Sequence, residues 1–295
     1  MRTVVAGAAG WLGAHACRRL LADGGEVVAL VERHVGADDP RAQALRQAGA
    51  TVARTDLRDA PALRRHVRDS DALVNMARAQ GLRRGSAWGS AARATQVVLE
   101  LARELRVPRV VHVGCSRSPA SRHVVEATVE PLQRRGLPVV VASPDVVYGP
   151  ADPGPVGRML DRLARGRLPL LPTGGEHGWT HVEDAAGGIA AALRQGKPGF
   201  AYALTGPVHT LREAATVAAS HLGRRPPVFV PSAVHAPMRW LESVAETLPS
   251  GPFWDAELAA LAHTSCAPQD GLAHEHLGWS PRPLEQGLRE TLAAR

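Results

Sequence analysis

Lysine and tyrosine are almost absent from this sequence. Of its 35 lysines and arginines only Lys197 is a lysine, and the two tyrosines are Tyr148 and Tyr202. Four positions after these tyrosines stand Asp152 and Gly206, so no tyrosine is followed by a lysine at that spacing. A site that needs a tyrosine hydroxyl next to a lysine amine could therefore use only these three residues.

Cysteines and long apolar runs are also scarce. The three cysteines, Cys17, Cys115 and Cys266, are scattered and odd in number. This pattern argues against a disulfide framework or a zinc site, so we expect no metal and a reducing, cytoplasmic environment. No apolar run is long enough to cross a bilayer, and the chain starts directly in a strand-like segment, so we expect neither a membrane partner nor a signal peptide.

The chain is basic but poor in aromatic residues. Its formal net charge is +7 and aromatic residues make up 4%. The arginines are dispersed among acids, whereas a nucleic-acid groove clusters bases with stacking aromatics, so we expect no nucleic-acid partner. A small-molecule substrate fits better, and the positive charge leaves an anionic one open. The wealth of alanine, arginine, glycine and proline is typical of a GC-rich bacterial genome.

The amino-terminal stretch carries the clearest motif. A short apolar run at 3–6 is followed by glycines, a helical pattern at 11–22 and a second apolar run from residue 26. A glycine-rich turn between strand and helix predicts a dinucleotide site, because the helix start attracts a pyrophosphate. Gly7 permits the tight turn, Gly10 the close approach of the phosphates, and Gly13 the packing of helix on strand. The predicted contacts are Gly7, Gly10, Trp11, Leu12 and Gly13.

Two charged residues of opposite sign follow the second apolar run. Glu32 favours NAD, because an acid here accepts hydrogen bonds from the adenosine ribose. Arg33 keeps NADP open, because a base here accommodates a 2′-phosphate. The cofactor is therefore NAD or NADP, with NAD slightly favoured.

Strand-like and helical segments alternate along the first half. Apolar runs at 51–54, 71–77, 109–114 and 138–142 are separated by helical patterns. This alternation predicts an α/β fold, a Rossmann-type doubly wound parallel sheet with right-handed crossovers. We expect it to occupy residues 1–150, with a smaller α/β substrate-binding portion at 151–295. No flexible linker separates them, so the two should pack intimately.

Several motifs resemble one family. They are the Gly-x-x-Gly-x-x-Gly turn, Val-Val-Tyr-Gly-Pro at 146–150, Trp-Thr-His-Val-Glu-Asp at 179–184 and Leu-Gly-Trp-Ser-Pro at 277–281. Together they resemble the extended short-chain dehydrogenase/reductase family, which includes sugar-nucleotide epimerases and dehydratases. The resemblance covers nearly the whole chain and is closest to the reductase and hopanoid-associated epimerase-like branch. It implies an NAD(P) cofactor and a small-molecule substrate, and leaves a homodimer open.

The resemblance also implies further cofactor contacts. Asp56 and Leu57 would lie against the adenine, and Met76 and Ala77 would line the pyrophosphate and ribose. The loop that holds Pro144 would touch the nicotinamide face. Arg78 would either meet a phosphate bidentately or lie in a surface loop.

The family's proton-transfer residues are the point of departure. Family members carry Ser or Thr at the end of the fifth strand and a Tyr-x-x-x-Lys pair on the next helix. Here Cys115 stands at the position of the Ser or Thr. Arg122 and Glu126 stand where the Tyr and Lys would fall, and an alignment shifted by one residue puts His123 and Ala127 there instead. The candidate catalytic residues are His123, Cys115, Glu126 and Tyr148.

Three explanations of this departure stay open. Another group moves the proton, the nucleotide assists a non-redox elimination, cyclisation or isomerisation, or the protein binds its nucleotide as a regulator without chemistry. The intact substrate-half motifs favour an enzyme of the epimerase, dehydratase or reductase type that acts on a biosynthetic intermediate.

Overall fold

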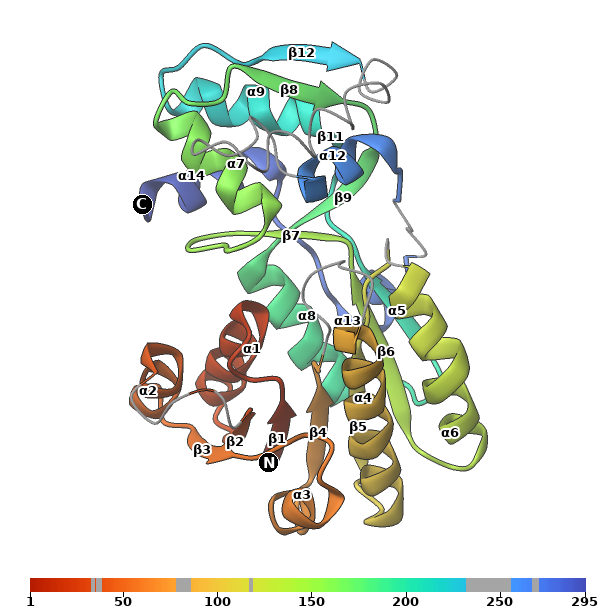
Figure 1. Cartoon of the computed structure of the whole chain (residues 1–295). Coiled ribbons are helices and arrows are strands. Elements are labelled where there is room, and N and C mark those ends of the chain that lie inside the picture. The colour runs from red at the N-terminus through yellow and green to blue at the C-terminus, as the bar shows by residue number, and fades with distance from the viewer. Residues whose placement is uncertain (33–34, 36–38, 78–85, 117–118, 232–255, 267–270) are drawn as a thin grey trace. The chain divides into compact units, whose positions relative to one another are not determined.

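The computed structural model describes residues 1–32, 35, 39–77, 86–116, 119–231, 256–266 and 271–295 (Figure 1). These residues form two compact units. Unit 1 comprises Met1–Pro144, Glu183–Leu204 and Asp270–Ser280. Unit 2 comprises Asp145–Val182, Thr205–Gln269 and Pro281–Arg295.

The division differs from the single boundary at residue 150 that the sequence suggests. Two later segments return to unit 1, so the units are interleaved along the sequence. One reason is that strand β10 (Ala201–Leu204) pairs in parallel with β6 (Val139–Pro144). A pairing between strands so distant in sequence leaves no local signal, which is why the sequence pattern missed it.

Unit 1 is built on a seven-stranded sheet with the order β10-β6-β5-β4-β1-β2-β3. Its other strands are β1 (Arg2–Ala6), β2 (Glu26–Val31), β3 (Thr51–Arg54), β4 (Ala72–Asn75) and β5 (Arg109–Val113). Every neighbouring pair is parallel. The strand order reverses direction between β1 and β4, and ligands of such folds bind beyond the carboxyl ends of the strands at this switch point. The predicted doubly wound α/β fold is confirmed.

Helices cover both faces of this sheet. They are α1 (Trp11–Ala22), α2 (Pro40–Gln47), α3 (Ala60–Val67), α4 (Ser86–Glu104), α5 (Pro119–Val124), the π-helical η1 (Val125–Val129), α6 (Glu130–Arg134), α8 (Val182–Gln195) and α13 (Leu272–Leu277). Val5 packs in one hydrophobic cluster with residues of α1 and α8. Val4 packs in another with residues of α3 and α4. Val4 and Val5 point to opposite faces of the sheet because successive side chains of a strand alternate. Both faces are covered by helices, so both positions are apolar.

Unit 2 holds two small sheets and its own core. The strands are β7 (Val146–Tyr148), β8 (Leu170–Thr173), β9 (Glu176–His181), β11 (Val208–Thr210) and β12 (Val228–Pro231). The helices are α7 (Pro155–Ala164), α9 (Leu211–His221), α12 (Ala256–His263) and α14 (Leu284–Ala293). One sheet has the order β11-β9-β7 and the other pairs β12 with β8. Trp179, Tyr148 and Leu160 are among its fully buried core residues. Among the described helices of the chain, none is long and apolar enough to span a bilayer.

Candidate functional site

The glycine turn connects β1 to α1 and packs against the end of β4. Gly7 has a φ of +84°, and a Cβ added there would lie 2.7 Å from the carbonyl oxygen of Met76. A Cβ added at Gly13 would lie 2.4 Å from the carbonyl oxygen of Gly7. Both distances are too short for any side chain, so these positions require glycine. The turn is thereby seated at the switch point of the sheet, next to Met76.

Helix α1 starts in a form suited to an anion. Its N-cap, Gly10, is extended, and neither a side-chain cap nor an acidic residue occupies the first turn. The amide of Gly10 donates to the carbonyl of Gly7 at 3.1 Å, which closes the turn. The first-turn amides, from Trp11 to Gly13, lie at the positive end of the helix dipole. These features fit the pyrophosphate of a dinucleotide.

A histidine supports the first residue of this helix. The rings of Trp11 and His15 meet edge to face with centroids 5.7 Å apart. Nδ1 of His15 lies 2.5 Å from Oε1 of Glu183, which belongs to α8. The helix that begins at the turn is therefore joined to a second helix on the same face of the sheet. Sequence analysis named Glu183 only as part of the motif at 179–184 and passed over His15.

The adenosine end of the predicted site is the edge formed by β2 and β3. Glu32 follows β2 and is exposed, while Arg33 lies outside the described residues. Asp56 accepts two hydrogen bonds from the Arg58 guanidinium, at 2.9 Å from Nε and 2.7 Å from a terminal nitrogen. Leu57 is buried in the core cluster that contains Val4. The cofactor roles of these residues stay predictions.

A buried polar network holds the end of β4. The amide of Ala77 donates to Oδ1 of Asn75 at 3.2 Å, and Nδ2 of Asn75 lies 3.1 Å from Nδ1 of His112 on β5. Because Oδ1 is the acceptor, Nδ2 donates to His112, and a neutral imidazole then carries its proton on Nε2. Thr95 donates its hydroxyl to the carbonyl of Ala77 at 3.3 Å. Met76 and Ala77 are thus held firmly, whereas Arg78 lies outside the described residues.

Sequence reasoning missed this network, although one signal was available. A histidine within an apolar strand is unusual, and Asn75 and His112 are direct partners in the register of β4 and β5. The apolar pattern of the sequence predicts β4 and β5 as strands, but it does not predict the register in which their residues pair.

The carboxyl ends of β5 and β6 bring several small polar groups together. The amide of Cys115 donates to Oγ of Ser121 at 2.8 Å, and the Cys115 side chain is buried. The Ser116 amide donates to the carbonyl of Pro144 at 3.2 Å. A Cβ added at Gly114 would lie 2.8 Å from Oγ of Ser143 and 3.3 Å from Oγ of Ser121. Sequence reasoning named Cys115 and Pro144 but overlooked Ser121.

Two other catalytic candidates follow Ser121 along the chain. His123 on α5 and Glu126 on η1 are both exposed. They stand three positions apart on consecutive helical segments, which puts them near one face. A π-helical turn at this place is notable, because such turns often occur at functional sites.

Tyr148 has a different environment from the one predicted. It is fully buried in the core of unit 2. Its ring meets those of Trp179 and His181 edge to face, at 5.9 and 5.6 Å between centroids. A Cβ added at Gly287 would lie 2.1 Å from its hydroxyl oxygen. Such enclosure is the environment of a packing residue rather than that of an exposed proton donor.

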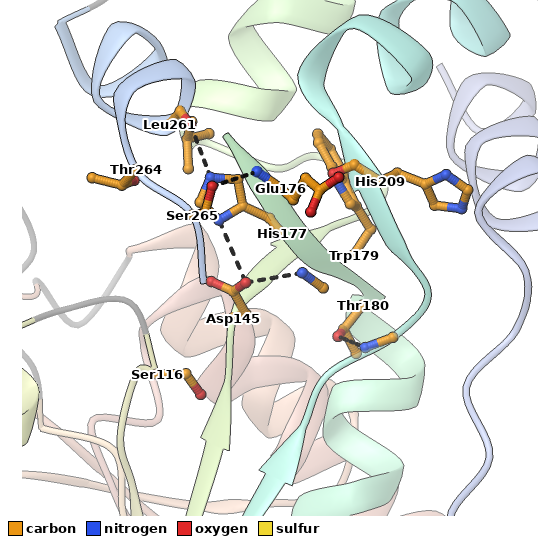
Figure 2. A network of polar contacts seen from close by, with 12 residues as sticks. Ser116, Asp145, Glu176, His177, Trp179, Thr180, His209, Leu261, Thr264 and Ser265 are labelled. Carbon is orange, nitrogen blue, oxygen red and sulfur yellow. Dashed lines mark hydrogen bonds and ion pairs between the residues drawn. The ribbon is translucent and has the colours of Figure 1, made fainter. Parts of the chain in front are cut away.

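Unit 2 contains a second buried polar network, shown in Figure 2. Asp145 accepts a hydrogen bond from the amide of Gly178 at 2.9 Å and lies 3.5 Å from Nδ1 of His177. Nε2 of His177 lies 2.8 Å from the carbonyl oxygen of Leu261, to which it donates. The side chains of Asp145 and His177 are completely buried. The network fastens α12 and the start of β7 to β9, which is a structural role.

Comparison with known proteins agrees with this geometry. A dinucleotide-type turn at the switch point of a parallel sheet defines the class of nucleotide-binding α/β proteins. The model of the NAD dependent epimerase/dehydratase family matches residues 3–118. A curated relative, sterol demethylase protein B of Methylococcus capsulatus, is 30% identical over 239 residues, which cover 70% of each chain. The chain belongs to the NAD-dependent epimerase/dehydratase family, of the extended short-chain dehydrogenase/reductase type.

Solved structures of this fold are also similar over their whole length. A nucleoside-diphosphate-sugar epimerase from Pseudomonas aeruginosa has a TM-score of 0.79 at 22% identity, covering 100% of this chain and 97% of that one. The dTDP-glucose 4,6-dehydratase DesIV from Streptomyces venezuelae, solved with NAD and TYD bound, has a TM-score of 0.76 at 24% identity, covering 100% and 96%. At these sequence identities, the similarity shows only that the fold is shared.

Proposed function

We propose that this protein is an NAD(P)-dependent enzyme of the epimerase, dehydratase or reductase type with a nonstandard active site. Its substrate would be a small biosynthetic intermediate. The observation that carries the proposal is the turn at Gly7 and Gly13, whose backbone leaves no room for side chains at the switch point. Family membership supports a nicotinamide nucleotide as the ligand of this turn.

The residues present fit such a nucleotide. The turn and the start of α1 would hold the pyrophosphate, and Met76 and Ala77 would face its ribose. Glu32 favours NAD, because its carboxylate would accept hydrogen bonds from the ribose hydroxyls. When bound, the nicotinamide ring supplies the hydride acceptor or donor, and the protein supplies position and proton transfer.

In this proposal, groups other than a Tyr-x-x-x-Lys pair transfer the proton. The chain has one lysine, and neither tyrosine precedes it at the required spacing. His123 and Glu126 are the proposed proton donors or acceptors, since both are exposed and stand on the helical segments that follow β5 in the chain. Cys115 is a weaker candidate because it is buried. The role proposed for it is to position Ser121 through its amide.

Two substrate classes deserve direct comparison. The neighbours named above are a nucleoside-diphosphate-sugar epimerase and a dTDP-glucose dehydratase, but their low identity carries only the fold. The more closely related sequence is named a sterol demethylase protein. That name favours an apolar, sterol-like alcohol or ketone as the first substrate to test, with an anionic sugar nucleotide as the second.

Two alternatives rest on the missing tyrosine–lysine pair. The scaffold would support a non-redox lyase, cyclase or isomerase in which the nucleotide is not consumed. It would equally support a nucleotide-binding regulator without catalysis. A regulator would respond to the ratio of NAD to NADH without converting any substrate.

The test compares two glycines. Gly13→Ala places a methyl group 2.4 Å from a carbonyl oxygen, whereas Gly187→Ala in α8 meets only an arginine nitrogen at 3.5 Å. We expect Gly13→Ala to weaken binding of NADH and NADPH by about ten-fold or more, which is about 1.4 kcal/mol, and Gly187→Ala to leave it unchanged. Circular dichroism checks that both variants fold, and Gly10→Val is the substitute if Gly13→Ala does not. Equal binding by folded Gly13→Ala and wild type would contradict the proposal.

Catalysis is tested separately. Mass spectrometry of the nucleotide that co-purifies identifies the cofactor form, and turnover is then followed by nicotinamide absorbance with both substrate classes. A His123→Ala/Glu126→Gln double variant should lose turnover while it keeps nucleotide binding. Unchanged turnover in this variant would exclude both residues as proton carriers.

A further inference from the structure

The edge formed by the ends of β2 and β3 carries a charged residue that no motif singles out. Val31 and Arg54 are partners in the parallel register of these strands. The amide of Thr55 donates to the carbonyl of Val31 at 2.9 Å, so the pairing continues one step beyond β3. Glu32 and the turn from Thr55 to Arg58 therefore leave the sheet side by side.

Arg58 is the cation of this edge. Its backbone amide donates to Oδ1 of Asp56 at 2.9 Å, and its guanidinium adds the two side-chain bonds already described. These bonds to Asp56, and the further charge of Glu32, hold the pKa of Arg58 above its ordinary value. The guanidinium thus lies in the field of two carboxylates. The side chain of Arg58 is 53% exposed and that of Asp56 is 34% exposed, so both are open to a ligand.

We propose that Arg58 sets the preference of this protein between NAD and NADP. The inference rests on the proposed function, which places the adenosine ribose at this edge. Glu32 and Asp56 alone would present two negative charges to a 2′-phosphate and repel it. Arg58 cancels one of these charges and offers a planar fork of donors that matches phosphate oxygens.

The expected consequence is tolerance of both nucleotides. With NAD bound, Glu32 accepts hydrogen bonds from the ribose hydroxyls. With NADP bound, one guanidinium nitrogen of Arg58 donates to the 2′-phosphate in place of Asp56. Because these groups are exposed, salt screens the effect, and the preference depends on ionic strength.

Arg41 provides a matched control. Its backbone amide, Nε and a terminal nitrogen bind Asp39 in the same pattern, at 2.8, 3.0 and 2.8 Å. Among the acids that the structure describes, Asp39 alone raises the pKa of Arg41. Glu32 raises the pKa of Arg58 but is not among the causes of the shift at Arg41, so Arg41→Gln removes the same charge and the same local pair without the Glu32 interaction.

The experiment measures dissociation constants of NADH and NADPH for the full chain by titration calorimetry. Arg58→Gln should weaken NADPH about ten-fold more than NADH, which corresponds to about 1.4 kcal/mol. Glu32→Gln should shift the ratio the opposite way, in favour of NADPH, and Arg41→Gln should leave it unchanged. Raising the salt concentration should reduce the effect of Arg58→Gln.

The outcomes separate this inference from the function on which it rests. A wild-type protein that binds neither nucleotide overturns the proposed function and this inference with it. A wild type that binds NADH but not NADPH overturns the inference alone. So does an unchanged ratio in Arg58→Gln, or an Arg41→Gln variant that shifts the ratio as much as Arg58→Gln does. If Arg58→Gln fails to fold, Arg58→Lys decides: it keeps the charge but loses the planar fork, so it should weaken NADPH more than NADH, and an unchanged ratio would overturn the inference.

Discussion

Nδ1 of His15 lies 2.5 Å from Oε1 of Glu183, and this pair links the helix that starts at the glycine turn to α8. His15 also meets the ring of Trp11, the first residue of that helix. The orientation of the helix start, and hence of its amides, depends on a contact between residues 168 positions apart in sequence.

Removal of this pair should loosen α1. Glu183→Gln is expected to lower the free energy of unfolding by ~1 kcal/mol or less, because the Glu183 side chain is half exposed and solvent weakens the pair. Urea denaturation measures the change. Glu26→Gln is the control, since Glu26 is more exposed and lies 3.9 Å from Arg2. Equal losses in the two variants would show that the His15 contact adds nothing.

Asn75 should be far less tolerant of substitution. Asn75→Ala leaves the amide of Ala77 and Nδ1 of His112 without their buried partner, so we expect a loss of roughly 2–3 kcal/mol in unfolding free energy. Urea denaturation again gives the value. Gln96→Ala, which removes helix-surface bonds to Glu100 and from Arg93, should cost much less. A small effect of Asn75→Ala would mean that water satisfies these groups.

The cysteines should differ sharply in reactivity. Burial raises the pKa of the Cys17 thiol from 9.0 to about 12, so almost no thiolate exists at neutral pH. Cys266 is partly exposed. Iodoacetamide labelling of the native protein at about pH 8, read by mass spectrometry, should modify Cys266 and spare Cys17. Labelling of Cys17 before unfolding would contradict the burial.

The first turn of α2 should respond to acid. Hydrogen bonds from the Arg41 side chain and backbone lower the pKa of Asp39 from 3.8 to about 2. Because the folded pKa is the lower one, the stabilisation by Asp39 is present above the unfolded value of 3.8 and is lost as pH falls through about 2. Unfolding measured across this range should show a steeper acid loss in wild type than in Asp39→Asn. A pKa near 3.8 for the Asp39 carboxyl in the folded protein would contradict its pairing with Arg41.

Local pattern predicted the scaffold well. The apolar runs and the spacing of Gly7, Gly10 and Gly13 predicted the parallel sheet and its turn, because these features depend on residues close in sequence. The same reasoning identified Glu183 and Asp184 only as part of the family-like motif at 179–184.

Pairs formed across the fold escaped prediction. The contacts of His15 with Glu183, of Asn75 with His112 and of Asp145 with His177 each join isolated polar residues on different elements. A sequence pattern predicts an element but not its neighbour. Tyr148 shows the same limit: its motif suggested the nicotinamide end, whereas its side chain fills the core of unit 2.

The central claim is that the turn at Gly7–Gly13 binds a nicotinamide nucleotide although no tyrosine in the sequence is followed by a lysine four positions later. Titration calorimetry of the purified protein with NAD, NADH, NADP and NADPH tests it most directly. The account predicts saturable binding of at least one of them, about one per chain, that Gly13→Ala weakens. A folded wild-type protein that takes up none of the four would contradict it.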